Sequence, residues 1–282
     1  MEEILGEVSD ALAAADDGGS AELAEPRVFG PAAAIRAAEY LLAAAGDEDA
    51  VTQIPPAAQT LVVPTTDPWP RALMVVTESP DDLQAPLLLT LVQTGPRDQY
   101  RLWSWARLFP GVEMPPTAQP EIGSVPVEED AEMLTVPPTD VLVRYIDVLT
   151  NGDASEHAGE FLPDDLREAV ANNRAAWTTL VGSNGSLTET YAAADVGPFA
   201  IATADGGAIV VGVVQTVTTI GLSNATLTIS DQTAALVGGT TLHSNLVLTW
   251  DSVVVFVVPP EGSAEPVQVL GAEHALVQAT GT

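Results

Sequence analysis

The apolar positions at the start of the chain recur at helical spacing in two segments. Within residues 2–15 apolar side chains return about every four residues, and the sequence DDGGS at 16–20 ends the pattern. We predict a short, frayed helix there, followed by a tether. A second helix is predicted from Pro31 to Gly46, because proline favours the first turn of a helix and glycine favours its C-terminal end.

Apolar and β-branched runs then predict four strands, separated by turns that contain proline and aspartate: 60–63, 72–77, 86–94 and 100–108. The order of these segments, one helix and then four strands, is typical of a small antiparallel meander. We therefore predict an acidic N-terminal segment and tether at 1–26, and an N-terminal α+β domain at 27–109.

Seven prolines from Pro110 to Pro138 exclude regular helix and central strand from the middle of the chain. Carboxylates within 128–132 make the same stretch acidic. We predict a Pro-rich acidic linker at 110–137. It would pack along a domain through four apolar anchors: Met114, Ile122, Val125 and Leu134.

The second half predicts helices first and strands afterwards. Pro137 and Pro138 precede a helix that Asn151 and Gly152 can close, and a second helix is predicted at 164–180. Runs rich in Val, Thr and Leu then predict five strands: 209–220, 225–230, 242–250, 253–258 and 267–277. These elements form a C-terminal domain at 138–282. The predicted fold class is α+β, with two domains that each pack helices on a curved antiparallel sheet.

The composition of charged residues and the absence of Cys limit the reactions and binding sites that the chain can provide. The chain has 39 Asp and Glu, nine Arg, no Lys and no Cys, which gives a formal charge of -30. Without Lys and Cys there is no Schiff base, no P-loop lysine, no thiolate zinc site and no disulfide. The negative field repels phosphates, so we predict no nucleic-acid partner and no direct binding to anionic membranes. No cofactor is predicted.

The compartment is predicted from composition. A chain that uses Arg in place of every Lys and is rich in Ala, Val, Asp and Thr is typical of a GC-rich bacterium, and the absence of Cys suits export. Residues 1–17 are acidic and lack the apolar core of a signal peptide. We expect an extracellular or envelope-attached protein whose native N-terminal signal is absent from this sequence; a cytoplasmic protein is the alternative.

Three segments carry a resemblance to a known superfamily. VLVRYIDVLTNGD at 141–153, residues 161–166 and VLGAEHALV at 269–277 resemble the opening helices and closing sheet of NTF2-like and cystatin-like proteins. From Arg27 onward the chain also resembles an uncharacterised family of secreted actinobacterial lipoproteins, through WPR at 69–71, YRLWSW at 100–105 and Met114-Pro115. The resemblance implies the fold, a conical pocket in the C-terminal domain and an envelope location, but no particular activity.

The histidines give the first candidates for chemistry. No two of His157, His243 and His274 lie within five residues, so no local metal motif exists and we predict no metal ligands. His243 and His274 fall in predicted strands, and with Asp147 or Asp195 either would form an acid/base pair of a dehydratase or isomerase. The competing interpretation is that they are ordinary strand histidines.

Aromatic and basic side chains cluster around one predicted strand. Trp103 and Trp105 face the same side of it, with Trp69 and Tyr100 nearby, as in a patch that binds sugar, peptide or protein, or as in a hydrophobic core. Three arginines surround them and would meet either an acidic ligand or the acidic linker, of which we favour the intramolecular pairing: Arg97, Arg101 and Arg107.

These observations favour a non-catalytic binding or scaffold protein of the cell envelope or of the secreted fraction, with an unknown ligand and no assigned catalytic, cofactor or metal residues. The alternative is an NTF2-like small-molecule enzyme, of the dehydratase or isomerase type, that uses Tyr145, Asp147, His243 or His274 in the C-terminal pocket. An open polar pocket would favour the enzyme, and a filled apolar one would argue against it. A third hypothesis is a homodimer formed through the exposed face of the long sheet.

Overall fold

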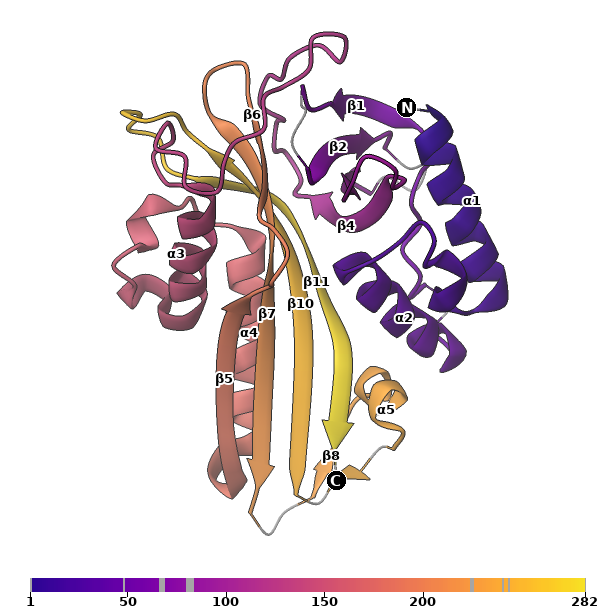
Figure 1. The fold of residues 1–282 in the computed structure, drawn as a ribbon. Coiled ribbons are helices and arrows are strands. Elements are labelled where there is room, and N and C mark those ends of the chain that lie inside the picture. The colour runs from indigo at the N-terminus through magenta and orange to yellow at the C-terminus, as the bar shows by residue number, and fades with distance from the viewer. Residues whose placement is uncertain are drawn as a thin grey trace.

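A computed structural model describes residues 2–47, 49–65, 69–79, 84–223, 226–239, 241–242 and 244–281 (Figure 1). Its α-helices are α1 (Glu2–Gly18), α2 (Pro31–Ala44), α3 (Pro138–Asn151), α4 (Asp165–Val181) and α5 (Asp231–Val237). The strands of the first half are β1 (Ala58–Val62), β2 (Arg71–Thr77), β3 (Leu87–Gln93) and β4 (Arg101–Leu108). Those of the second half are β5 (Gly185–Ala193), β6 (Phe199–Ala202), β7 (Ala208–Leu222), β8 (Leu227–Thr228), β9 (Thr241–Leu242), β10 (Asn245–Val258) and β11 (Gln268–Gly281).

The strands of both predicted domains are hydrogen-bonded into one antiparallel sheet. Its order is β1-β2-β3-β4-β11-β10-β7-β5, and β6 pairs with β7 off this path. The two halves meet between β4 and β11, where only Leu108 with Gly271 and Arg107 with Ala272 are in register. In Figure 1 the strands of the first half cross the direction of the long strands of the second half. The α+β class, with helices packed on an antiparallel sheet, is confirmed.

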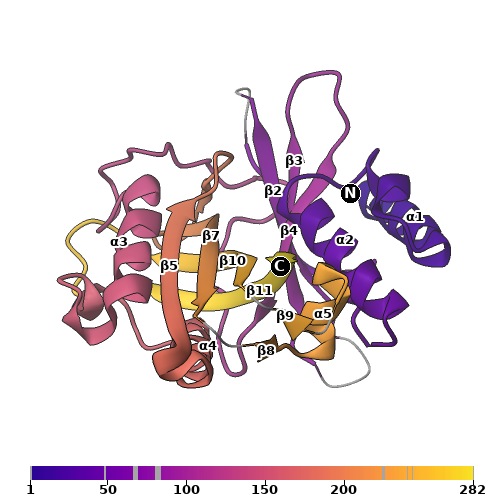
Figure 2. The same cartoon turned by 90° about the horizontal axis from the view of Figure 1, so that it is seen from below.

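Two hydrophobic cores lie on opposite faces of the long strands. One contains α3, α4 and residues such as Val210, Val254 and Phe256. The other joins α1, α2 and the strands of the first half to Val211 and Val253. Figure 2 shows α3 on one side of the long strands and α1 and α2 on the other. The long strands therefore contribute one face to each core: α3 and α4 pack on one face, and the N-terminal part of the chain packs on the other.

The predicted helix at 2–15 is present as α1, but it packs into the core and is not frayed. The predicted tether is wrong, because residues 21–24 form a 3-10 helix whose Ala24 is buried. Leu5, Val8, Leu12 and Ala15 are buried, because positions three, four and three residues apart form one continuous stripe on a helix. The Tyr40 hydroxyl also donates a hydrogen bond of 2.6 Å to Asp16. Hydrophobic contact and this partly buried hydrogen bond fix α1 against α2.

The substitution Leu12→Ala tests this packing. Leu12 is 4% exposed, so its truncation should lower the free energy of unfolding by about 2–4 kcal/mol, as for other buried leucines. Asp10→Ala, at an exposed position of the same helix, should change it by less than about 0.5 kcal/mol. Urea unfolding followed by circular dichroism measures both. Equal small effects would mean that α1 contributes nothing to the core.

The segment 110–137 forms no helix or strand, and it contacts both halves of the chain. Single bridges join Pro64 to Ser124 in the first half and Leu134 to Pro260 in the second. Leu134 is buried, whereas Ile122 and Val125 are 71% and 61% exposed, so only part of the predicted set of anchors is used. No helix among the described residues is both long and apolar enough to cross a membrane.

Candidate functional site

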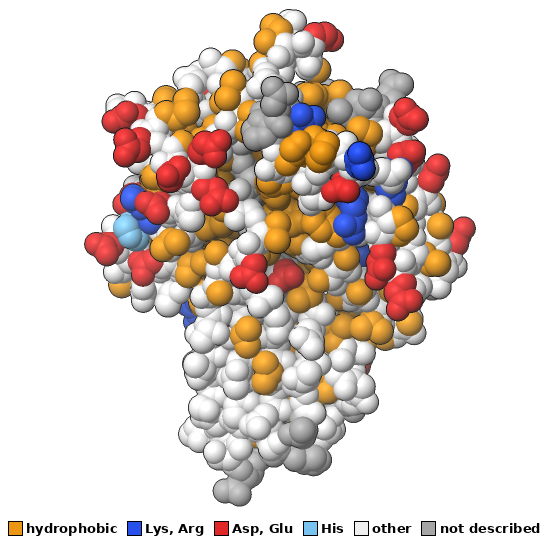
Figure 3. Space-filling view, in the orientation of Figure 1, with side chains coloured by type: hydrophobic (Ala, Val, Ile, Leu, Met, Phe, Trp, Pro, Cys, Tyr) orange, Lys and Arg blue, Asp and Glu red, His pale blue; other side chains and the backbone are white. Residues whose placement is uncertain are grey.

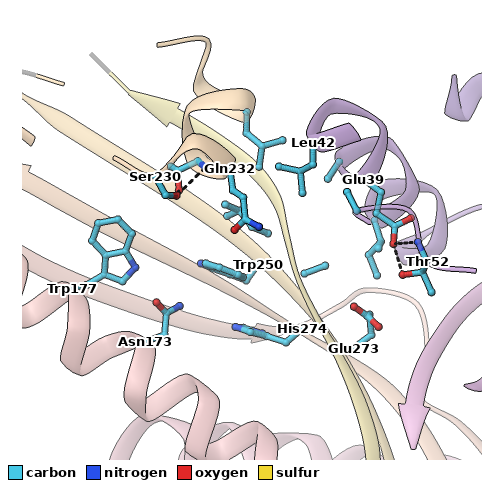
Figure 4. Close-up of a pocket in the computed structure, with 17 residues that line it drawn as sticks. Glu39, Leu42, Thr52, Asn173, Trp177, Ser230, Gln232, Trp250, Glu273 and His274 are labelled. Atoms are coloured by element: carbon cyan, nitrogen blue, oxygen red, sulfur yellow. Dashed lines mark hydrogen bonds between the residues drawn. The ribbon is translucent and has the colours of Figure 1, made fainter. Parts of the chain in front are cut away.

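A cavity of about 370 Å³ lies along the free edge of β11, between α2, α4 and α5 (Figure 4). Four consecutive residues of β11, 273–276, line it. Successive side chains of a strand point to opposite faces, so this lining places the cavity at the strand's edge. β4 pairs with β11 only as far as Ala272, and none of the described strands pairs with that edge from Glu273 onward. We call this space the edge cavity.

One wall of the edge cavity is acidic. Glu39 of α2 is 7% exposed; its Oε1 accepts hydrogen bonds from the Thr52 hydroxyl (2.6 Å) and backbone N–H (3.3 Å). Its Oε2 lies 3.1 Å from Arg36 Nη1. Burial raises the pKa of Glu39, and the charge of Arg36 and the Thr52 hydrogen bonds oppose that rise. The structure thus holds a carboxyl group here at an electrostatic cost that Arg36 partly offsets.

Glu273 adds a second carboxyl group to the same cavity. Burial raises its pKa to about 7, the charge of Glu39 adds to the rise, and Arg107 opposes it. Near neutral pH this group is therefore divided between its protonated and charged forms. A cation that entered the edge cavity would favour the charged form.

The other wall is aromatic. The rings of Trp250 and His274 stack with centroids 4.7 Å apart and an interplanar angle of 7°, and Trp177 of α4 lies on the same side of the cavity (Figure 4). His274 Nδ1 is 2.8 Å from the Ser252 hydroxyl. Burial lowers the pKa of His274 to about 4, so its ring is neutral at pH 7. Trp250 Nε1 and His274 Nε2 are buried without a hydrogen-bond partner among the described residues.

Polar and apolar side chains complete the lining. Asn173 and Gln232 provide amide groups, while Ile35 and Leu42 of α2 and Leu236 of α5 provide apolar surface. No group of three His, Cys, Asp or Glu suited to a metal ion is found in the part of the chain that the structure describes. The arrangement offers carboxyl acceptors, indole rings and alkyl contacts within one half-open space.

The two perturbed groups should give opposite pH dependences of stability. Glu273 has a folded pKa above its ordinary 4.5, so the folded state binds more protons and its contribution to stability falls as pH rises from 4.5 to about 7. His274 has a folded pKa below its ordinary 6.5, so its contribution rises between pH 4 and 6.5. The two slopes oppose each other over most of this window.

Glu273→Gln should therefore make stability rise more steeply with pH between 4.5 and 6.5, and His274→Asn should make it fall. Urea midpoints measured across this range compare both variants with the unsubstituted protein. Identical pH profiles for all three proteins would contradict the burial of these groups.

A scan against protein-family models matches residues 7–281 to a domain of unknown function, DUF8094. The chain belongs to this family. Neither a search of curated proteins nor a search of solved structures found a match. The DUF8094 match spans both halves and the segment between them, in agreement with a sheet that both halves share. The resemblance to NTF2-like proteins and to secreted lipoproteins stays a prediction.

In this DUF8094 protein, the space beneath α3 is filled. Tyr145 packs against Phe161 and Phe256, with ring centroids 5.4 Å and 5.1 Å away. Its hydroxyl donates to Asp164 at 2.8 Å, and burial raises its pKa. Asp147 accepts hydrogen bonds from neighbouring groups at the end of α3. Tyr145 thus belongs to the hydrophobic core, and Asp147 binds groups close to it in the sequence.

The structure does not bring the other predicted acid/base residues together. His274 lines the edge cavity, while Asp195 lines a different hollow. His157 lies 2.9 Å from Glu160 at its Nδ1, and His243 lies outside the described residues. The predicted combination of a histidine with Asp147 or Asp195 therefore finds no geometric support among the described residues.

The aromatic residues of β4 belong to the core. Trp103 and Trp105 are at most 1% exposed; the Trp103 ring meets Phe199 edge to face at 4.8 Å, and the Arg36 guanidinium lies over Trp105. Two of the three predicted arginines bind within the molecule, to backbone carbonyl oxygens and not to linker carboxylates, whereas Arg97 is exposed. The donors are Arg101, to Glu25 and Val28, and Arg107, to Ala85.

Proposed function

We propose that this DUF8094 protein is a non-catalytic binding protein whose edge cavity takes a small organic cation. The observation that carries the proposal is the meeting of two carboxyl groups, Glu39 and Glu273, with two indole rings, Trp177 and Trp250, in one cavity. Carboxylates attract a cation directly, and the faces of indole rings attract it through their quadrupole.

The size of the cavity limits the ligand. A volume of about 370 Å³ lies at the low end of the usual range for small-molecule sites. Ile35, Leu42 and Leu276 would contact the alkyl or aryl part of a ligand whose ammonium group faces the acidic wall. An amine that carries one ring or a short chain meets both requirements.

Isothermal titration calorimetry with choline, benzylammonium and, as the anionic control, benzoate tests this proposal. At least one cation should bind, benzoate should not, and affinity should increase as pH rises through about 7, where Glu273 becomes charged. Glu273→Gln should weaken binding about tenfold or more and remove the pH dependence. Glu265→Gln, at an exposed position away from the cavity, is the matched control.

Failure of both cations to bind would contradict the proposal, as would equal affinity for cation and benzoate. Retained affinity in Glu273→Gln would place the ligand elsewhere. The measurement thus separates binding in the edge cavity from general attraction to an acidic surface.

A second candidate is a small-molecule enzyme, and the pKa of Glu273 favours it. A carboxyl group with a pKa of about 7 suits a general acid or base that works near neutral pH. In this alternative Glu273 replaces the residues that the sequence predicted, because Tyr145 is buried in the core. Conversion of a bound amine, followed by nuclear magnetic resonance and lost in Glu273→Gln, would establish the enzyme in place of the binding protein.

The homodimer remains a third proposal, supported by one face of the long strands. Thr188, Thr190 and Thr219 are exposed there, whereas Glu189 of the same segment faces α4 and binds Arg174. Uncharged side chains would let two copies of an acidic chain approach each other. Sedimentation velocity should then show association that increases with salt, and a monomer at every concentration would contradict it.

We further propose that the protein acts outside the cytoplasm, as part of the cell envelope or in the secreted fraction. The absence of Cys from all 282 residues supports this location. Fractionation of the native host, with antibody detection, tests it, and recovery only with cytoplasmic markers would contradict it.

A further inference from the structure

A second hollow, of about 360 Å³, shares no lining residue with the edge cavity. It lies where the 126–129 part of the linker meets the start of β2 and the segment 195–201 before and within β6. Figure 3 shows apolar side chains exposed between carboxylates in this upper part of the molecule. We call this hollow the linker groove.

The floor of the linker groove is apolar and made of rings. Pro70, Pro126 and Pro198 line it together with Trp69 and Phe199. Proline and aromatic rings have few rotamers, so little conformational entropy is lost when a ligand packs on them. Phe199 is also held from below by Trp103. The groove is therefore a preformed surface with a buried support.

The position of the linker is set by backbone hydrogen bonds. The Val127 N–H donates to the Ala200 carbonyl at 2.9 Å, and the Ala202 N–H donates to the Val125 carbonyl at 2.8 Å. These bonds hold the linker beside β6, and Val196 stays 51% exposed at the edge of the groove. The linker therefore forms one wall of a binding surface, in addition to joining the two halves.

The rim of the linker groove is negative. Glu128 and Glu129 from the linker and Asp195 from the segment before β6 line it, and all three are exposed. The described lining contains no arginine. Arg71, next to the groove, lies over the Trp69 ring at 4.1 Å. Opposite charge on a partner would both orient it and speed its approach.

We propose that the linker groove binds an extended, proline-containing basic segment of a partner protein. Rigid aromatic and proline rings suit the ridges of a polyproline II segment, and the carboxylates at the rim suit its Arg or Lys side chains. The open shape, with rings along the floor and charges only at the rim, fits a chain that lies across the surface. This inference is independent of the cation proposed for the edge cavity.

Fluorescence anisotropy with three labelled peptides of equal length tests the partner's chemistry. The peptides alternate Arg with Pro, Arg with Gly, and Glu with Pro. We expect the Arg-Pro peptide to bind with a Kd of about 1–50 µM, the Arg-Gly peptide at least about fivefold more weakly, and the Glu-Pro peptide not at all. Equal affinity for the two Arg peptides, or no binding of either, would overturn the proposal.

Matched variants separate the groove from the general charge of the protein. A variant with Glu128→Gln, Glu129→Gln and Asp195→Asn should lose about tenfold or more in affinity. A control neutralises three exposed carboxylates elsewhere and carries the same net charge: Glu22→Gln, Glu156→Gln and Glu168→Gln.

The control should stay within about twofold of the unsubstituted protein. Equal losses in both triple variants would show attraction to the whole surface only and would overturn the proposal. Glu273→Gln should keep full affinity for the Arg-Pro peptide, because Glu273 lines the edge cavity and not the linker groove. Circular dichroism melts confirm that each variant is folded before its affinity is compared.

Discussion

Gly271→Ala is expected to break the junction between the two halves of the sheet. A Cβ at this position would lie 2.3 Å from the Arg107 carbonyl oxygen and 2.7 Å from Leu108 Cα. Both are backbone atoms of β4, so no side chain can move away to make room. The two strands would have to separate, and with them the hydrogen bond of 2.8 Å from the Phe109 N–H to the Leu270 carbonyl.

The expected loss is about 3–5 kcal/mol in the free energy of unfolding, because the clash disturbs the backbone of a buried junction. Urea unfolding, followed both by circular dichroism and by tryptophan fluorescence, measures it. Gly159→Ala is the matched control, since a Cβ there meets nothing within 4 Å. A midpoint unchanged from that of the control would mean that the close approach of β4 and β11 does not hold the halves together.

The same experiment tests the predicted division into domains at 27–109 and 138–282. One hydrophobic core joins Trp103 and Trp105 of the first half to Phe199, Val211 and Val253 of the second. Residues of one core should unfold together, so we expect a single transition for the unsubstituted protein. If Gly271→Ala separates the two probes into two transitions, the halves are units that fold separately once the junction is lost.

Local pattern was enough to predict most elements of the fold. The predicted helix at 31–46 and the predicted strands at 72–77, 86–94 and 100–108 agree with α2, β2, β3 and β4 to within two residues at each end. Apolar residues recur about every 3.6 positions in a helix and every two positions in a strand, because those side chains face the core. This spacing can be recognised without knowing which element packs against them.

Where the predicted bounds of an element were wrong, contacts with residues distant in the sequence determined the structure. The polar pair Asp251 and Ser252 predicted a break between two strands, but β10 continues through both. Gln215 donates to Asp251 at 3.1 Å, and Ser252 pairs with His274. The partners come from β7 and β11, so no local pattern could indicate that these polar side chains would be satisfied inside a sheet. Two further elements were not predicted: β5, in which exposed and partly buried residues alternate, and the short helix α5.

The candidate site could be predicted only in part. His274 was singled out as one of three histidines, but its neighbour Glu273 was not, because only burial beside Glu39 makes that carboxyl group unusual. Glu39 and Glu273 are separated by 234 positions in the sequence, and the edge cavity exists because β4 leaves β11 after Ala272. A site that depends on where a partner strand stops has no signature in the chain itself.

The second large effect is expected at Arg36, the most deeply buried charge of the described chain. Arg36 is 1% exposed, and Nη1 lies 3.1 Å from Glu39 Oε2 and 3.6 Å from Asp16 Oδ1. Nη2 donates to the Thr52 carbonyl at 3.0 Å, and the guanidinium lies 5.2 Å from the Trp105 ring centroid. One cation therefore holds α1, α2 and the 49–53 segment together.

Arg36→Met keeps much of the volume but removes the charge, which leaves the Glu39 carboxylate buried without its counter-ion. We expect a loss of about 3–5 kcal/mol in the free energy of unfolding at neutral pH, as when one partner of a buried pair is removed. Adding Glu39→Gln should recover about half of it or more, because the unpaired charge is then gone. Urea unfolding of both single variants and the double variant gives the coupling between them.

The pH dependence identifies the cause of this loss. Without Arg36, only the Thr52 hydrogen bonds oppose the burial that raises the pKa of Glu39. The folded variant should therefore keep a proton on Glu39 at pH values where the unfolded chain has released it, above the ordinary pKa of 4.5. The penalty of Arg36→Met should then grow as pH rises from about 4 to about 8. A penalty that is the same at both ends would assign the loss to packing against Trp105 and to the Thr52 hydrogen bond, and not to the charge of Glu39.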